Sequence, residues 1–201
     1  MQLQNSLPSG GRPAVFLDRD GTLTERRHYP ARPDDLVLQP GIGPPLRALR
    51  EHGAALVLVT NQSGLARGLF DEADLAAMHE HLGKLLSRLG VRLDGVYTCP
   101  HHPDGTVLRY RIVCQCRKPA TGMLRQATHD LRLDLARSWM VGDSGCDIEA
   151  GQEVGTRTAL VAERPLSDGL LPDVHETTTA GALDKVRRSV GRLSRPTGCS
   201  H

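Results

Sequence analysis

The sequence predicts an α/β fold with a doubly wound, mainly parallel sheet, because two kinds of segment alternate along the chain. Short apolar runs, bounded by polar residues or glycine, have the length of buried strands. Longer segments repeat apolar residues every three or four positions, which is typical of helices that bury one face. The predicted strands are Ala14–Leu17, Ala54–Thr60, Leu93–Thr98, Ser138–Val141 and Arg157–Val161.

The predicted helices fill the intervals between these strands, and glycines end several of them. After the first strand comes an irregular stretch, residues 25–41, that is rich in arginine and proline. Asp71 is a suitable N-cap for the longest helix. The predicted core stripe of this helix is Leu75, Met78, Leu82, Leu85 and Leu89. The other predicted helices are Pro44–His52, Thr121–Leu131, Asp147–Val154 and a last segment with the stripe Leu183, Val186, Val190 and Leu193.

A chain of 201 residues has the size of one domain with a substantial core. We expect a single domain over residues 12–194 with disordered tails at 1–11 and 195–201. No insertion is long enough for a separate cap domain. The formal charge of +2 points to no particular partner, no apolar run reaches the ~18 residues of a membrane span, and the N-terminus is not a secretory signal. We therefore expect a soluble cytoplasmic monomer that binds neither nucleic acid nor a membrane.

The most informative motif, Asp18-Arg19-Asp20-Gly21-Thr22, follows the first predicted strand directly. In an open α/β sheet, ligands bind at the carboxyl ends of the strands. Two carboxylates at this point can serve as a nucleophile and as an acid–base group, and Gly21 lets the backbone turn away. Taken alone, the motif also fits a turn with two solvated aspartates.

Three further segments favour chemistry over a simple turn. The second predicted strand ends at Thr60-Asn61-Gln62-Ser63-Gly64, and Arg117-Lys118-Pro119 lies in the middle of the chain. The fourth predicted strand leads into Gly142-Asp143-Ser144-Gly145-Cys146-Asp147. This ordered set resembles the haloacid dehalogenase superfamily of phosphoryl-transfer enzymes, and the resemblance runs from about Ala14 to Val161.

The charges of these residues suit a phosphate monoester, which carries two negative charges near neutral pH. Asp18 and Asp143 offer the oxygen ligands that Mg²⁺ prefers. Lys118 supplies a second, compact cation. The Thr60 hydroxyl and the backbone N–H of Asn61 can donate to phosphate oxygens. The motifs therefore contain the positioning and charge-neutralising groups that phosphoryl transfer needs.

The resemblance implies more specific roles. Asp18 would be the nucleophile that forms an aspartyl-phosphate, and Asp20 would protonate the leaving alcohol and then activate water. The backbone carbonyl of Asp20 and the carboxylate of Asp143 would join Asp18 as ligands of a catalytic Mg²⁺. Asp147 either reaches the metal through water or orients Asp143 or Lys118, the third catalytic residue. The predicted substrate-binding residues at the first two strand ends are Arg19, Thr60, Asn61, Gln62 and Ser63.

A second constellation lies in one excursion of the chain, residues 99–118. It begins with Cys99-Pro100-His101-His102-Pro103 and continues to Cys114-Gln115-Cys116, just before Lys118. Three cysteines and a histidine suit a structural, tetrahedral Zn²⁺ with no open position. Reduced surface thiols are the alternative, and a disulfide is not expected in the cytosol. The predicted zinc ligands are Cys99, His101, Cys114 and Cys116, the histidine being chosen over His102 by resemblance.

The pattern C-P-H-H-P followed by C-x-C-R-K-P resembles the D-glycero-D-manno-heptose 1,7-bisphosphate 7-phosphatases, as does the segment 61–68. This resemblance implies Mg²⁺-dependent removal of the C7 phosphate, with Arg117 contacting the remaining phosphate or sugar oxygens of a small phosphorylated sugar. One loop departs from the family's N-x-D-x-G-Y-like pattern and reads Thr24-Glu25-Arg26-Arg27-His28-Tyr29. Its basic residues suit either a second phosphate or a solvated face, so the exact sugar and anomer stay open.

Three other functions remain as alternatives. The related histidinol-phosphate phosphatases share the zinc motif but usually have a shorter loop before the second cysteine pair. The T-N-Q sequence after the second strand is also similar to polynucleotide 3′-phosphatases, although no basic stripe with interleaved aromatics supports that function. A zinc-stapled binding module without catalysis is the fourth possibility. The second acid at Asp20 favours a phosphatase over a dehalogenase, and the lack of a G-x-x-x-x-G-K-[ST] loop argues against ATP as a phosphate donor.

Overall fold

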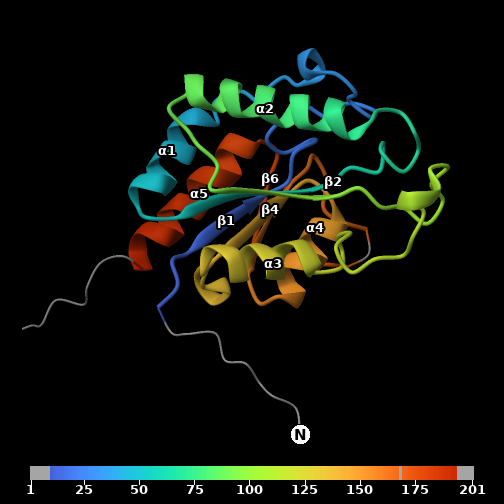
Figure 1. Cartoon of the computed structure of the whole chain (residues 1–201). Helices are drawn as coiled ribbons and strands as arrows, with labels where there is room; N and C mark the ends of the chain where they lie inside the picture. Colours follow the sequence, from blue (N-terminus) through green and yellow to red (C-terminus); the bar gives the residue numbers. More distant parts are fainter. Residues whose placement is uncertain (1–9, 168, 194–201) are drawn as a thin grey trace, which may run out of the picture.

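The computed structural model describes residues 10–167 and 169–193, so most of the two predicted tails and Cys199 lie outside the described residues. Six strands form one parallel sheet in the order β3-β2-β1-β4-β5-β6 (Figure 1). The strands are β1 Ala14–Leu17, β2 Ala55–Asn61, β3 Gly95–Cys99, β4 Trp139–Gly142, β5 Arg157–Val161 and β6 Val174–Glu176. The predicted fold class is therefore confirmed.

Helices cover both faces of the sheet (Figure 1). The helices are α1 Gly43–Glu51, α2 Glu72–Arg88, α3 Gly122–Leu131, α4 Gly145–Glu153 and α5 Thr179–Leu193. Alternate residues of β1 serve the two layers: Val15 and Leu17 belong to the core under α1, α2 and α5, whereas Ala14 and Phe16 belong to the core under α3 and α4. Strands that are buried on both sides explain why these runs are apolar throughout.

The five predicted strands and five predicted helices are all present, with ends that shift by one or two residues. Asp71 caps α2 as expected, and its side chain accepts a hydrogen bond from the N–H of Asp74. The predicted stripe of α2 missed Leu86, which is fully buried, whereas the predicted Leu85 and Leu89 are partly buried and pack against the core. Leu86, four residues after Leu82, therefore lies closer to the centre of the buried face than Leu85, three residues after it.

One strand was missed by the sequence analysis. β6 has three residues, each half-buried, and it pairs with the outer edge of β5. A segment this short has no apolar alternation that would distinguish it from a loop. It extends the sheet at its edge, and Thr177 and Thr178, which follow it, line a cavity with Gly21 and Asp143.

The sheet register brings the sequence motifs to one edge. Leu17 at the end of β1 is level with Leu58 of β2 and Val141 of β4, so the motifs after β1 and β4 emerge side by side, next to the last residues of β2. On the outer side of β2, Asn61 is level with Cys99 of β3. The chain from β3 to α3 then makes the 99–118 excursion, and Val107 N–H donates to the Ala66 carbonyl at 2.9 Å.

The predicted absence of a large cap domain is confirmed for the described residues, since the loops after β1 and β3 contain only the short 3-10 turns Pro33–Asp35 and Leu108–Tyr110 (Figure 1). None of the described helices is both long enough and apolar enough to cross a membrane.

Candidate active site

Asp18 stands at the carboxyl end of β1, in the middle of the sheet. Its backbone N–H donates to the Val141 carbonyl of β4 at 3.0 Å, so the strand ladder continues up to this residue. The turn that follows requires a glycine. Gly21 has a φ of +89°, and a Cβ at this position would lie 1.9 Å from Asp143 Oδ2. The glycine thus allows the first and fourth motifs to approach closely.

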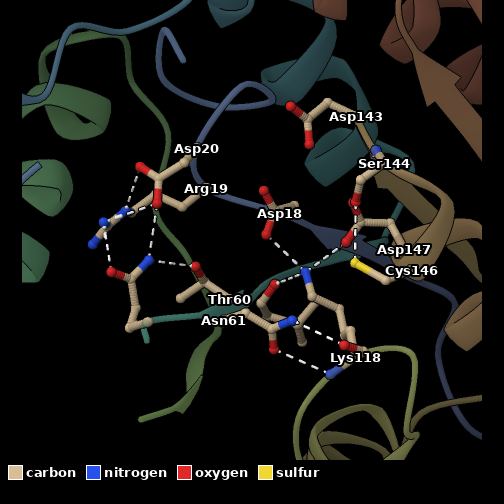
Figure 2. Close-up of polar contacts among 12 residues, drawn as sticks. Asp18, Arg19, Asp20, Thr60, Asn61, Lys118, Asp143, Ser144, Cys146 and Asp147 are labelled. Atoms are coloured by element: carbon tan, nitrogen blue, oxygen red, sulfur yellow. Dashed lines mark hydrogen bonds and ion pairs between the residues drawn. The ribbon is translucent and has the colours of Figure 1, made fainter. Parts of the chain in front are cut away.

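Lys118 is buried beside Asp18 and connects two carboxylates (Figure 2). Its Nζ lies 2.7 Å from Asp18 Oδ1, 2.6 Å from Asp147 Oδ1 and 2.7 Å from the Val59 carbonyl oxygen. Burial favours the neutral amine, but the carboxylates outweigh it and raise the pKa of Lys118. Burial also raises the pKa of Asp18 to about 7, against the opposing attraction of the ammonium. The lysine is therefore a fixed positive charge next to the predicted nucleophile.

The donor set at this edge fits a magnesium ion. Asp18, Asp143 and Asp147 place carboxylate oxygens within 4.8 Å of one another. Burial raises the pKa of Asp143, although Arg26 opposes this change. Three acids beside one buried lysine leave an excess of negative charge, which a hard divalent cation with oxygen ligands would neutralise. The cluster therefore has the chemistry of a Mg²⁺ site.

Asp147 was left open by the sequence analysis, and the structure gives both of its carboxylate oxygens partners. Oδ1 pairs with Lys118, and Oδ2 accepts the Ser144 N–H at 3.2 Å and contacts the Ser144 hydroxyl. Ser144 is the N-cap of α4, and the S-x-x-D pattern that begins this helix is a capping box. This local signal in the sequence could have identified Asp147 as a residue with a defined orientation.

Asp143 also contacts the loop that departs from the family pattern. Arg26 Nε donates to Asp143 Oδ2 at 3.0 Å, and Arg26 Nη2 contacts the same oxygen. The Arg26 side chain is 69% exposed, whereas that of Asp143 is 10% exposed. A loop residue therefore covers one oxygen of a predicted metal ligand.

Asp20 is held by a buried network on the other side of Asp18 (Figure 2). Arg19 donates to Asp20 Oδ1 through Nε at 3.0 Å and to Oδ2 through Nη2 at 2.9 Å. Gln62 Nε2 donates to Asp20 Oδ2 at 2.9 Å and to Thr60 Oγ1 at 2.8 Å, and its Oε1 accepts from Arg19 at 2.8 Å. Arg19 has no exposed surface. Arg19 and Gln62 therefore hold the predicted acid–base group, and their contact with substrate stays a prediction.

Asn61 connects the second motif to the third. Its Oδ1 accepts the Lys118 backbone N–H at 3.1 Å, and its Nδ2 donates to the Lys118 carbonyl at 3.0 Å. The lysine backbone is thus held by a residue on the end of β2. The sequence predicts only a phosphate-binding role for Asn61, because a pairing between residues 57 positions apart leaves no local pattern.

Two neighbouring cavities border Asp20 and Asn61, and a third, of about 590 Å³, is lined in part by Gly21, Arg26 and Asp143. A cavity of about 220 Å³ is lined by Asp18, Asp20, Thr60, Asn61, Arg117, Lys118, Ser144, Cys146 and Asp147. A second cavity of about 440 Å³ is lined by Asp20, residues 26–30, residues 61–64 and Asp143. Asp20 and Asn61 border both cavities. The structure therefore brings Asp18, Asp20 and Lys118 together with Arg117. Ser63 and residues 26–29 lie beside them.

The four predicted zinc ligands also lie together, with all ligand atoms within 4.8 Å of one another. The Cys116 sulfur is 3.2 Å from the sulfurs of Cys99 and Cys114, and His101 Nδ1 is 3.3 Å from Cys116 and 3.8 Å from Cys99. A tetrahedron with Zn–S bonds of ~2.3 Å has edges of about 3.8 Å. The cluster has nearly this size, and its thiols and imidazole are the ligands that zinc prefers.

Comparisons with known proteins agree with this geometry. A model of HAD-hydrolase-like proteins matches residues 115–178. Two relatives are called D-glycero-beta-D-manno-heptose-1,7-bisphosphate 7-phosphatase. The protein from Yersinia pestis is 45% identical over 77% of this chain and 84% of its own length. The protein from Escherichia coli K12 is 44% identical over 77% of this chain and 82% of its own length.

Two solved structures are similar over most of their length. A protein from Mesorhizobium loti described as a HAD-like phosphatase has 35% identity, a TM-score of 0.82 and coverage of 94% of this chain and 90% of its own. A D,D-heptose 1,7-bisphosphate phosphatase from B. bronchiseptica, complexed with magnesium and phosphate, has 33% identity and a TM-score of 0.76, with coverage of 88% and 98%. The chain therefore belongs to the heptose-1,7-bisphosphate 7-phosphatase family of HAD-type hydrolases.

Proposed function

We propose that this protein is a Mg²⁺-dependent phosphatase that removes the C7 phosphate of D-glycero-D-manno-heptose 1,7-bisphosphate. The observation that carries the proposal is the cluster of Asp18, Lys118, Asp143 and Asp147 at one sheet edge, within a chain of this family. Family relatives carry the beta anomer in their names, which makes it the first anomer to test.

In the proposed reaction, an Asp18 oxygen attacks the C7 phosphorus and the bond from phosphorus to the C7 oxygen breaks. Asp20, in its protonated form, gives its proton to the leaving C7 oxygen. Asp20 then takes a proton from a water molecule that attacks the phosphorus, and Asp18 leaves as a carboxylate with release of inorganic phosphate. Asp20 borders both cavities, which supports this role beside either the leaving group or water.

Lys118 neutralises charge near the phosphoryl group through its fixed ammonium, which already lies 2.7 Å from the Asp18 oxygen. Asp18, Asp143 and the Asp20 backbone carbonyl would hold the magnesium ion. When bound, this ion reduces the repulsion between the carboxylate nucleophile and the phosphate dianion. Asp147 acts in this proposal as a positioning residue for Lys118, because its oxygens already bond to Lys118 and Ser144.

Zinc has a structural role in the proposal. Cys99, His101, Cys114 and Cys116 would bind one ion, with no position left for a substrate. Arg117 follows Cys116 directly and borders the smaller cavity, so the bound ion would hold Arg117 near the substrate. We propose that this guanidinium contacts the phosphate that is not hydrolysed.

A phosphate-release panel tests the function. The substrates are both anomers of D-glycero-D-manno-heptose 1,7-bisphosphate, fructose 1,6-bisphosphate, histidinol phosphate and a 3′-phosphorylated oligonucleotide, each with Mg²⁺. We expect the highest kcat/KM for a heptose bisphosphate and, by ³¹P NMR, a product that keeps its C1 phosphate. A higher kcat/KM for histidinol phosphate or for the oligonucleotide would contradict the proposal.

A further inference from the structure

Two basic residues of the sequence motifs have no role in the reaction described so far. Arg67 belongs to the 61–68 segment, and His102 is the second histidine of C-P-H-H-P. They meet where the 99–118 excursion, called the zinc loop below, contacts the loop after β2, and Arg67 Nη2 lies 3.4 Å from His102 Nε2.

Both of these nitrogen atoms are hydrogen-bond donors. The backbone N–H of Asp104 donates to His102 Nδ1 at 3.1 Å, so Nδ1 is the accepting nitrogen and Nε2 carries the hydrogen. If the ring were protonated, Nε2 would still carry a hydrogen, so it is a donor in either state. The exposed Asp104 carboxylate lies 3.8 Å from Nδ1 and thus on the other side of the ring. Two donors therefore face each other across 3.4 Å without an acceptor.

Arg67 has a second unsatisfied donor. Its Nε is buried and has no hydrogen-bond partner among the described residues. The guanidinium instead lies over the ring of Tyr29, with 5.7 Å from Cζ to the ring centroid. A buried N–H without an acceptor is destabilising, more so on a charged group. Together these donors make a site that lacks a negatively charged acceptor.

The position of the pair suits a group attached to the substrate. Tyr29, beneath Arg67, lines the 440 Å³ cavity that Asp20 also borders. On the other side, Arg117 Nη1 donates a hydrogen bond to the carbonyl of His101, which precedes His102, at 3.4 Å. Arg117 also lines the cavity that Asp18 borders. Neither Arg67 nor His102 lines these two cavities, but both are next to residues that form their walls.

We propose that Arg67 and His102 form a subsite for the phosphate that is not hydrolysed, with one phosphate oxygen accepting from Arg67 Nη2 and His102 Nε2. The proposal rests on the proposed function for the identity of the ligand, a sugar bisphosphate. It adds two specificity-determining residues to Arg117, and it explains why two donors are placed together without a partner.

The kinetic test compares two substrates that differ only in the distal phosphate, heptose 1,7-bisphosphate and heptose 7-phosphate. Arg67→Met should lower kcat/KM for the bisphosphate roughly ten- to a hundredfold, mainly through KM, because a charge-assisted hydrogen bond is lost. The loss for the 7-phosphate should stay below about threefold. Equal losses on both substrates would overturn the proposal.

His102 provides a matched pair of variants. His102→Ala removes the donor and should show the same selective loss, whereas His102→Gln places an amide N–H near the position of Nε2 and should recover part of it. A His102→Gln enzyme no better than His102→Ala, with both variants folded by circular dichroism and with unchanged zinc content, would contradict the donor role.

A binding measurement separates this inference from the proposed function. Heptose 1-phosphate carries only the distal phosphate, and calorimetry in the Asp18→Asn background measures its affinity without turnover. Arg67→Met should weaken this affinity at least tenfold, whether or not the unaltered protein hydrolyses the C7 phosphate. An unchanged dissociation constant would overturn the subsite, whereas failure of C7 hydrolysis alone would overturn only the proposed function.

Discussion

The acidic cluster and the Cys/His cluster each bring ligand atoms within 4.8 Å of one another, but they are built in different ways. Asp18 and Asp143 directly follow β1 and β4, two adjacent strands of the sheet, and Lys118 beside them is buried. Three of the four Cys/His ligands lie on the excursion after β3 and are only half-buried. The first cluster stands on adjacent strands of the sheet, whereas the second lies mostly on a loop that a zinc ion, bound as proposed, would hold in place.

Lys118 is the residue at which the two clusters meet. Asn61 holds its backbone from β2 through two hydrogen bonds. Cys116 precedes it by two residues in the chain, so a zinc ion bound as proposed would hold it from the other side. The comparison therefore predicts that damage to the acidic cluster is severe, whereas damage to the zinc loop is partly compensated by Asn61.

The largest expected effect is that of Asp18→Asn. The amide cannot attack phosphorus, so kcat should fall by roughly 10⁴-fold or more, as in other enzymes that lose a nucleophile. The fold should be retained, since an amide oxygen can still accept from Lys118. Steady-state kinetics and circular dichroism measure both results. Turnover close to that of the unaltered protein would remove Asp18 from the mechanism.

Lys118→Met should lower kcat/KM by about 10²–10³-fold, because a charge next to the phosphoryl group is lost. It should also reduce the free energy of unfolding by about 3–5 kcal/mol, since two buried carboxylates lose their cation. Urea unfolding measures this change. The control is Lys84→Met: Lys84 pairs with Glu80 at 2.6 Å, but both side chains are more than 60% exposed. This variant should change stability by less than about 1 kcal/mol. A similar loss in both variants would refute the buried network.

Asp143→Ala should lower activity and Mg²⁺ affinity together, because one of few charged ligands is removed. The affinity is measured by the Mg²⁺ dependence of kcat and by calorimetry. We expect the concentration for half-maximal activity to rise at least tenfold, which corresponds to about 1.4 kcal/mol. Full activity in protein stripped of metal, with magnesium verified absent, would contradict a magnesium requirement.

Arg117→Ala tests the edge of the zinc loop that faces the cavity. The variant should lose about 1.5–3 kcal/mol of transition-state stabilisation on a sugar bisphosphate, roughly ten- to a hundredfold in kcat/KM. The small monoester p-nitrophenyl phosphate lacks the distal group and should be affected much less. If both substrates lose the same factor, Arg117 does not contact that group.

Zinc removal should have the smallest effect on catalysis. One zinc should copurify per chain, and Cys116→Ser should abolish it while lowering kcat only about tenfold, because a looser loop misplaces Lys118 slightly. Cys146→Ser, a change to a thiol outside the cluster, should keep one zinc by elemental analysis.

Combining Cys116→Ser with Asn61→Ala should lower kcat by more than the product of the two single effects, since both constraints on Lys118 are then lost. Simple multiplicativity would argue against two parallel constraints.

Much of this arrangement could be predicted from the sequence. The strands that precede Asp18 and Asp143 were recognisable because a run buried on both faces is continuously apolar. The Cys/His cluster was recognisable because three cysteines and a histidine in one short excursion suit zinc, whereas His101 was chosen over His102 only by resemblance. The end of the α2 stripe was less secure, since Leu85 and Leu86 both follow Leu82 at a helical spacing and only packing distinguishes them.

By itself, the sequence determined which side chains stand at the strand ends and in what order, because burial periodicity and turn residues are local properties. Tertiary structure alone decided how those side chains pair: Lys118 with Asp18, 100 positions away, Asn61 with the Lys118 backbone, and Gln62 with Asp20. It also brought the donors of Arg67 and His102 face to face. These contacts depend on strand order and on how the loops after β2 and β3 pack together, and no local pattern contains that information.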